Sequence, residues 1–359
     1  MKNFIVRTIT GVLFVAAIVT CFMRPEAMIL LFALVTGLTV WEFTGLVNDY
    51  KNITVNRMIC TVAGVYFFLA MAGYNSGLTP SSVFIPYLVS IIYLLIAELY
   101  LKHPDPISNW AYTMMSQLYI ALPFSLLNVL AFRSVGFDIQ YTYLIPLCVF
   151  VFLWMNDTGA YLCGSLLGKH KLFPRISPGK SWEGSIGGGI LVMAIAVLIW
   201  YLTEQYGVNE LSLNAFEWAG LGLTVVIFGT WGDLIESLFK RTLGIKDSGT
   251  ILPGHGGMLD RFDSSLLAIP AAVVYLYTLT IIEQKALRKT EGFLLFRLIE
   301  NIQRRGIGVL QSHRNKTAVS LELCHLMVIA QDRAVWPCVK FFLQSVSYLL
   351  PEITGTVIG

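Results

Sequence analysis

Nine apolar segments, each about 20 residues long, occur along this chain of 359 residues, and they restrict its possible folds more than any other feature. A helix needs about 20 apolar residues to cross the hydrocarbon core of a membrane. Only 13% of the residues are charged, whereas about 25% is typical of soluble domains. We therefore expect an all-α, polytopic membrane protein. The predicted spans are residues 4–23, 27–47, 57–74, 83–101, 110–132, 141–163, 184–203, 216–235 and 264–283.

Lysine and arginine residues predict the orientation of these spans, because cytoplasmic loops are enriched in them. With a cytoplasmic N-terminus, thirteen of these residues fall in segments on the inner side, whereas Arg24 and Arg133 fall outside. The polar loops 164–183 and 236–263 then face the cytoplasm. We expect a multi-pass protein of the inner (cytoplasmic) membrane. The net charge of +3 is too small to indicate a nucleic-acid partner.

The stretch from Asp233 to Asp263 is the most polar part of the membrane region and lies between two apolar segments. It contains five carboxylates, four cationic side chains, one histidine and five glycines. Ionisable groups that are held this close to a bilayer indicate a functional site. We therefore expect the catalytic loops to include this stretch.

Several carboxylates of this stretch are spaced to form a metal site. In a helix, Asp233, Glu236 and Lys240 would share one face. Asp260 and Asp263, three residues apart, would share another. Oxygen ligands of this kind suit Mg²⁺, so we expect Asp233 and Asp260, from two neighbouring helix ends, to converge on one ion. The alternative is that Asp263 only caps the helix that follows it.

Residues 253–257, with the sequence Pro-Gly-His-Gly-Gly, separate these carboxylates. Consecutive glycines allow backbone N–H groups to point together and form a nest for phosphate. Cationic side chains bind phosphate through charge and paired hydrogen bonds. Metal, nest and cations together are what nucleotidyl transfer requires, because this catalysis consists mostly of positioning and charge stabilisation. Alternatively, the cations only set the membrane orientation, and His255 is only a turn residue. The candidate cations are Lys240, Arg241, Lys246 and Arg261.

Small and polar residues also occur within the predicted spans. Asn156 and Asp157 lie in the sixth span, where a carboxylate is costly unless it is paired or binds a ligand. A hydrogen bond between helices is the alternative. Glu42 either faces a cavity or lies at the depth of the lipid headgroups. The glycines at 187–189 would permit close packing of the seventh span.

The loop 164–183 contains most of the segment SPGKSWEG, which starts at Ser177. Its prolines exclude a continuous helix, so this segment predicts a shaped turn. Ser177 or Ser181 is in position to cap the next helix. Lys180, Ser181 and Glu183 are candidates for holding an anionic substrate, whereas the earlier lysines of the loop are explained by the membrane orientation alone.

The segment SLFKRTLGIKDSGTILPGHGGMLDRFDS, residues 237–264, resembles the signature of the phosphatidate cytidylyltransferases, also called CDP-diacylglycerol synthases. The segments NDTGAY and SPGKSWEG are similar to further segments of that family, and the resemblance covers about residues 1–282. It implies transfer of CMP from CTP to phosphatidate, which gives CDP-diacylglycerol and pyrophosphate in phospholipid biosynthesis. It also implies Mg²⁺ with a second cation such as K⁺, contact with membrane lipids, and a homodimer.

The resemblance assigns roles to individual residues of this sequence. The implied metal ligands are Asp233 and Asp260, followed by Asp263. The residues implied to contact phosphate during catalysis are Lys240, Arg241, Lys246, His255 and Arg261. Together with the patterns described above, the candidate substrate-binding residues are Asn156, Asp157, Ser177, Lys180, Ser181, Glu183, Asp247, Gly256 and Gly257.

The C-terminal part of the chain departs from the family, which usually ends near the ninth span. We expect a membrane-embedded cytidylyltransferase domain in residues 1–282 and an atypical tail of unknown role in residues 283–359. One alternative function is a related CTP-dependent enzyme that acts on another membrane lipid, such as a polyprenol or an ether lipid. A second is an ion-coupled transporter that uses Glu42, Asp157 and Asp233. A transporter of that kind would show inverted repeats, and the sequence shows no internal repeat.

Overall fold

The computed structural model describes residues 2–50, 53–135, 138–208, 212–249 and 256–282. The chain divides into two compact units, Met1–Tyr277 and Thr278–Gly359. The predicted tail, 283–359, and the candidate phosphate ligand His255 both lie outside the described residues. The described residues therefore belong to the first unit, except for residues 278–282 at the end of the last helix.

The predicted all-α membrane fold is confirmed. Eight helical segments within the described residues are long and apolar enough to cross a membrane. The first predicted span lies in α1 (Lys2–Phe22), whose apolar part Thr10–Phe22 is shorter. The eight segments are Pro25–Asn48 (α2), Arg57–Asn75 (α3), Ser81–Leu101, Pro106–Ala131, Leu144–Leu167 (α7), Trp182–Gln205 (α8), Ala215–Thr242 (α9) and Leu259–Ile282.

Three of these spans are not uniform α-helices. Ser81–Leu101 starts with a 3₁₀ turn (Ser81–Phe84) and continues as α4 (Ile85–Leu101). Pro106–Ala131 consists of α5 (Pro106–Met115), a π-helical segment (Ser116–Ala121) and α6 (Leu122–Ala131). The last span starts with the single turn α10 (Leu259–Phe262), and the chain turns at residues 263–264 before the helix continues.

Two short antiparallel hairpins connect helices. One pairs β1 (Phe132–Val135) with β2 (Asp138–Tyr141), and the other pairs β3 (Lys171–Phe173) with β4 (Ser177–Ser181). The second hairpin is the shaped turn predicted from the prolines of that loop, since proline excludes a helix there. The first was not predicted, and it delays the start of α7 to Leu144.

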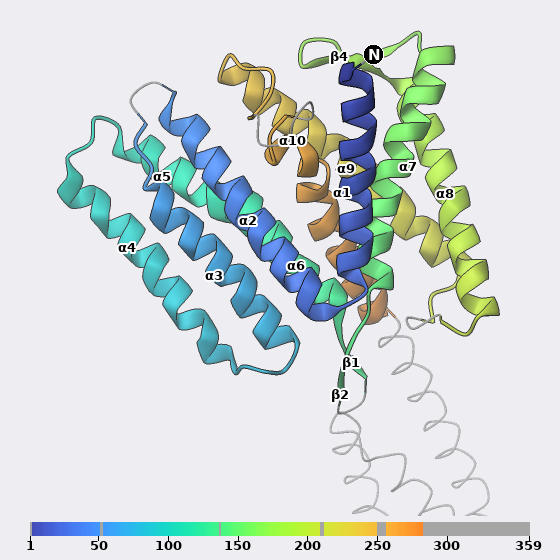
Figure 1. The fold of residues 1–359 in the computed structure, drawn as a ribbon, viewed down its shortest axis with the longest axis horizontal. Coiled ribbons are helices and arrows are strands. Elements are labelled where there is room, and N and C mark those ends of the chain that lie inside the picture. Colours follow the sequence, from blue (N-terminus) through green and yellow to red (C-terminus); the bar gives the residue numbers. More distant parts are fainter. Residues whose placement is uncertain (1, 51–52, 136–137, 209–211, 250–255, 283–359) are drawn as a thin grey trace, which may run out of the picture. The chain divides into compact units, whose positions relative to one another are not determined.

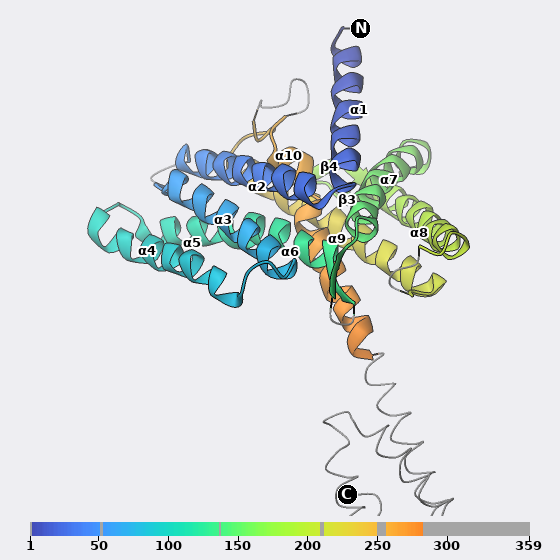
Figure 2. The same ribbon diagram turned by 60° about the horizontal axis from the view of Figure 1, so that its bottom comes forward.

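The helices of the first unit form two groups (Figures 1 and 2). In one group, α3 packs against α2, α4 and α6. In the other, α8 packs against both α7 and α9. The start of the last span, labelled α10, lies between the groups and contacts α2. The polar stretch predicted to be functional therefore joins the two groups, with α9 in one group and α10 against the other.

Aromatic packing fixes the position of α10. Phe262 is 2% exposed, and its ring lies 5.5–6.2 Å from the rings of four phenylalanines on four helices. Truncating a buried phenylalanine of this kind costs about 3–5 kcal/mol. The residue that follows is Asp263, so the same packing holds that carboxylate in place. The four partners are Phe14, Phe32, Phe124 and Phe150.

Glycines bring α7 and α8 close together, as the sequence predicted. A Cβ atom at Gly188 would lie 2.6 Å from Oδ1 and 2.8 Å from the carbonyl oxygen of Asn156. One at Gly184 would lie 2.8 Å from the carbonyl oxygen of Ala160. Only small residues permit this approach of two helix backbones. The consequence is that the polar side chains of α7 meet the start of α8.

Candidate active site

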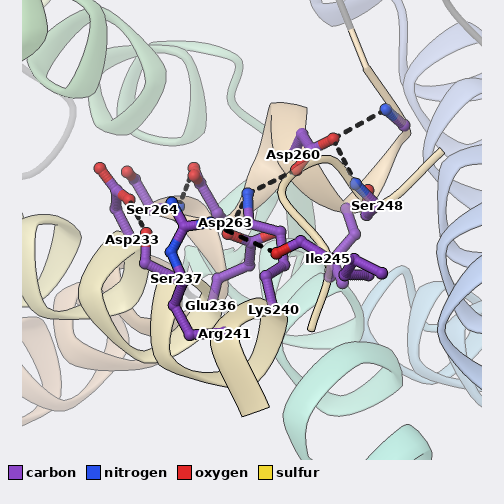
Figure 3. Close-up of polar contacts among 12 residues, drawn as sticks. Asp233, Glu236, Ser237, Lys240, Arg241, Ile245, Ser248, Asp260, Asp263 and Ser264 are labelled. Atoms are coloured by element: carbon purple, nitrogen blue, oxygen red, sulfur yellow. Dashed lines mark hydrogen bonds and ion pairs between the residues drawn. The ribbon is translucent and has the colours of Figure 1, made fainter. Parts of the chain in front are cut away.

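The C-terminal end of α9 carries acidic and basic side chains on one face. Lys240 Nζ lies 2.7 Å from Oε2 of Glu236, one turn earlier. Ser237 Oγ donates a hydrogen bond of 3.2 Å to Oδ1 of Asp233. The predicted sharing of one helix face is therefore confirmed (Figure 3). Glu236 is fully buried, so this face points into the protein rather than toward lipid.

Asp263 approaches this face because a glycine leaves room for its backbone. A Cβ atom at Gly232 would lie 2.7 Å from the carbonyl oxygen of Asp263 and 3.1 Å from that of Ser264. As a result, Asp233, Glu236 and Asp263 each place one carboxylate oxygen within 4.8 Å of the others. We call these three residues the acid cluster. It is the set of ligand side chains in the described part of the chain whose spacing suits a metal ion.

Asp260 lies next to the acid cluster but has different partners. Lys240 Nζ lies 2.6 Å from its Oδ1, and the backbone N–H groups of Ser248 and Gly257 each donate to its Oδ2 over 2.9 Å. Lys240 thus stands between Glu236 and Asp260 (Figure 3). Of the predicted ligands Asp233, Asp260 and Asp263, the acid cluster contains Asp233 and Asp263, and the convergence of Asp233 and Asp260 on one ion stays a prediction.

A polar pocket of about 200 Å³ opens beside the acid cluster, between α7, β4, α8 and α9. Lys180, at its edge, places Nζ 2.5 Å from Oδ2 of Asp233 and so connects the pocket to the cluster. Asn156 Oδ1 is buried there, and no hydrogen-bond partner for it is found in the described part of the chain. The structure therefore brings together four candidate substrate-binding residues, which are Asn156, Asp157, Lys180 and Ser181.

Ser181, one of these four, and the further candidate Glu183 make structural contacts. Ser181 is the N-cap of α8, and its Oγ accepts a hydrogen bond of 3.2 Å from the backbone N–H of Gly184. This was one of the two predicted caps. Glu183 accepts two hydrogen bonds of 3.2 Å from the backbone N–H of His170, and its Oε1 lies 2.6 Å from His170 Nδ1. Ser177, the other predicted cap, begins β4 instead.

The remaining candidates lie around the loop that follows α9. Lys246, Asp247 and Arg261 are exposed, and so is Arg241, which donates a hydrogen bond of 3.4 Å to the carbonyl oxygen of Ile245. Gly256 has a φ of 79°, a conformation that favours glycine. The N–H of Gly257, predicted to form part of a phosphate nest, donates to Asp260.

Comparison with known proteins identifies the family of the chain. The profile of the cytidylyltransferase family matches residues 5–279. The chain belongs to this family. The last 80 residues lie outside the match.

Three relatives of this cytidylyltransferase are phosphatidate cytidylyltransferases. A phosphatidate cytidylyltransferase of Staphylococcus haemolyticus is 34% identical over 269 residues, which cover 74% of this chain and 96% of the relative. The phosphatidate cytidylyltransferase of Staphylococcus aureus strain COL is 32% identical with the same coverage. That of Haemophilus influenzae is 32% identical over 278 residues, with 74% and 95% covered.

Glu42, on α2, is the residue of this cytidylyltransferase that the sequence did not assign to the site. It is 7% exposed and accepts hydrogen bonds from the Ser248 hydroxyl, from Met258 N over 2.8 Å and from Leu259 N over 3.1 Å. With Asp260 it ties both ends of the segment between Ser248 and Met258. We call Glu42 and Asp260 the loop clamp. The sequence feature that could have indicated a role for Glu42 is a lone glutamate within a predicted apolar span.

The acid cluster could hold a metal ion, because its carboxylate oxygens lie close to one another. Lys180 and Lys240 pair with part of this negative charge. Oε1 of Glu236 is buried with no hydrogen-bond partner among the described residues, whereas Oε2 lies 2.7 Å from Lys240 Nζ. A buried oxygen without a donor fits a site whose partner is a metal ion.

Proposed function

We propose that this protein is a phosphatidate cytidylyltransferase, which transfers CMP from CTP to phosphatidate and gives CDP-diacylglycerol and pyrophosphate. The acid cluster beside the polar pocket, in a chain that belongs to the cytidylyltransferase family, carries the proposal. Carboxylates that can hold a metal and lysines that can meet phosphate are the components that nucleotidyl transfer requires. Eight membrane-length helices fit an acceptor that resides in a bilayer.

The reaction needs no nucleophile from the protein. An oxygen of the phosphatidate phosphate attacks the α-phosphorus of CTP, the new P–O bond forms, and the bond from that phosphorus to the bridging oxygen of pyrophosphate breaks. The chain has to bring two anionic substrates together and balance their charge. Lys180 and Lys240 are candidates for this role, because their ion pairs with Asp233 and Glu236 hold both ammonium groups at the acid cluster.

The acid cluster would hold Mg²⁺, since oxygen ligands from carboxylates suit that ion. When bound, such an ion supplies charge neutralisation at the reacting phosphates. Asp260 remains a candidate ligand, and its contact with Lys240 assigns it at least the positioning of that lysine. A second cation such as K⁺ belongs to the same proposal.

The exposed cations in the last turn of α9 and beyond it are proposed to receive the triphosphate of CTP. Arg241, Lys246 and Arg261 are on the same segment as the acid cluster and are open to solvent. The polar pocket, with Lys180, is proposed to receive the phosphate of phosphatidate. His255, Asp247, Gly256 and Gly257 stay candidates for contacts with the nucleotide.

Location and assembly complete the proposal. The excess of lysine and arginine on one side supports an N-terminus and an active site in the cytoplasm, at the inner membrane. We propose that residues 1–282 form the catalytic domain and assign the tail no role in catalysis. A homodimer is proposed on the family resemblance alone.

Turnover of labelled CTP by the purified protein in detergent micelles tests this function. We expect CDP-diacylglycerol to form with phosphatidate and Mg²⁺, and Asp263→Asn to lower the rate about a thousandfold, because the metal contributes several kcal/mol to such reactions. Asp138→Asn, an exposed carboxylate on β2, is the matched control and should retain full activity. Conversion of a polyprenyl or ether-lipid phosphate but not of phosphatidate would overturn the assigned acceptor.

A further inference from the structure

An apolar groove with a volume of about 760 Å³ runs between α8 and α9, next to the β3–β4 hairpin. Its lining is almost entirely aliphatic and aromatic. Trp182, Ile186 and Ile190 form part of one wall on α8, and Ile227 and Trp231 form part of the opposite wall on α9. Phe173 of the hairpin lines one end. The proposed role of the active site, transfer between two phosphates, does not explain why this apolar space exists.

The two walls of the groove differ in length. On α8 the wall extends from Trp182 to Met193, and on α9 it extends from Leu223 to Leu238. These stretches of helix rise roughly 16 Å and 22 Å, and half of a hydrocarbon core of about 30 Å is close to the shorter of the two. The groove begins at the hairpin, at the end of α8 where the polar pocket lies. It therefore occupies the half of the span that adjoins the active site.

The groove adjoins the polar pocket, since Ser185 and Thr230 line both. Lys180, which lines the pocket, pairs with Asp233 of the acid cluster. A cationic group at the acid cluster and an apolar groove therefore lie on neighbouring sides of the same two residues. A ligand with an anionic phosphate at one end and a long hydrocarbon chain at the other matches that sequence of environments.

The groove is open along its side. Trp182, Ile186, Ile190 and Trp231 are each 55–59% exposed, although all four line it. In a protein that spans a membrane, apolar side chains exposed at this depth face lipid. A hydrocarbon chain can therefore enter sideways from the bilayer, without leaving an apolar environment.

We propose that this groove binds one acyl chain of the phosphatidate substrate while the phosphate of the same molecule lies in the polar pocket near Lys180. The inference rests on the proposed function and adds to it the surface that selects the lipid tail. The shared lining of groove and pocket, the charge of Lys180 and the open apolar side of the groove all identify the occupant as a lipid of the adjoining leaflet.

Filling the groove tests the proposal. Ile190 lies eight residues along α8 from Trp182, roughly 12 Å deeper, where a chain of six carbons makes less contact than a chain of eighteen. The variants are Ile190→Trp and, on the opposite wall, Ile227→Trp, each assayed with dioleoyl and with dihexanoyl phosphatidate. We expect the KM ratio of dioleoyl to dihexanoyl lipid to rise about tenfold, the factor for roughly two methylene groups that lose their contact.

Ile92→Trp is the matched control. Ile92 is 54% exposed on α4, outside the groove, and the same substitution there should leave the ratio unchanged. The second groove variant keeps the test valid if one of them fails to fold. An unchanged ratio in both groove variants overturns the inference. A change of oligomeric state with an unchanged ratio also overturns it, because the groove is then a contact between copies of the chain.

The failure of the proposed function has a different outcome. If the unmodified protein converts neither dioleoyl nor dihexanoyl phosphatidate, the function itself is wrong. If it converts both and the ratio does not respond to the groove, only the inference about the acyl chain is wrong.

Discussion

The acid cluster and the loop clamp contain the same chemical group, but their oxygens have different surroundings. In the acid cluster, the carboxylates of Asp233, Glu236 and Asp263 face one another. In the loop clamp, Glu42 and Asp260 accept hydrogen bonds from backbone N–H groups of the segment that they hold. Carboxylates that face one another repel unless a cation joins them, whereas those that accept N–H groups are stabilised in their ionised form. We therefore expect the acid cluster to bind a ligand and the loop clamp to shape the site.

The difference is clearest for Asp260 and Asp263, which are three residues apart and identical in type. Asp260 is fixed by two N–H groups and by Lys240. Among the residues that the structure describes, the N–H donor recorded for Asp263 is that of its neighbour Ser264, over 2.5 Å, and Asp263 also faces the carboxylates of α9. A motif that contains both aspartates therefore does not by itself tell which one binds the metal.

Replacing Asp233 by asparagine should produce the largest effect and test the acid-cluster side of the comparison. We expect Asp233→Asn to lower turnover about a thousandfold and to raise the Mg²⁺ concentration that gives half-maximal rate. The midpoint of thermal unfolding in detergent should stay within a few degrees, because loss of the pair with Lys180 is offset by less repulsion among the carboxylates. A large fall in the midpoint would instead place Asp233 among the residues that shape the site.

Replacing Glu42 by glutamine should produce the second largest effect and test the loop clamp. The amide retains one acceptor oxygen for three donors, so we expect about 3 kcal/mol less stability. Displacement of the segment should lower kcat about a hundredfold. The Mg²⁺ dependence should remain that of the unmodified protein, which separates this variant from Asp233→Asn.

Glu98→Gln is the matched control for that experiment. Glu98 is also a glutamate in a predicted span, and it lies 3.0 Å from His103 Nδ1 and accepts from Asn109 over 3.2 Å, away from the signature loop. It should lower stability without a change in kcat per folded molecule. A changed Mg²⁺ dependence in Glu42→Gln would contradict a purely positioning role.

Replacing Ser181 by alanine should have the smallest effect and extends the comparison to a hydroxyl group. Since its oxygen accepts a backbone N–H of α8, we expect a loss of about 1 kcal/mol in stability and a change in turnover of at most about threefold. Ser185→Ala, in the same pocket but not a cap, is the control. A tenfold loss of turnover at unchanged stability would make Ser181 a substrate ligand rather than a cap.

The sequence predicted the fold and part of the site for identifiable reasons. Apolar length located the spans, and helical spacing placed Asp233, Glu236 and Lys240 on one face. Both patterns are local. Proline and glycine likewise indicated the turn that became the β3–β4 hairpin.

Contacts between distant segments were not predictable in this way. Glu42 meets Ser248 across 206 positions of the chain, and no periodicity connects them. The approach of Asp263 to α9 depends on the space at Gly232 and on the packing of Phe262, which are properties of the assembled helices. The β1–β2 hairpin was missed although the pair Gly136-Phe137 stands between its strands in the sequence, and a glycine-first pair is typical of two-residue hairpin loops.

The partnership between Glu42 and Met258 has a consequence for biosynthesis. The two residues are separated by 216 positions, and ribosomes add about 5–20 residues per second. The α2 helix is therefore synthesised roughly 10–40 s before the N–H groups that its glutamate accepts. During that interval the nascent chain carries an unmatched carboxylate at a membrane helix, and the catalytic apparatus becomes complete only when the final helix has been inserted. A ribosome that stalls before that point leaves an inactive product, however much of the bundle has already assembled.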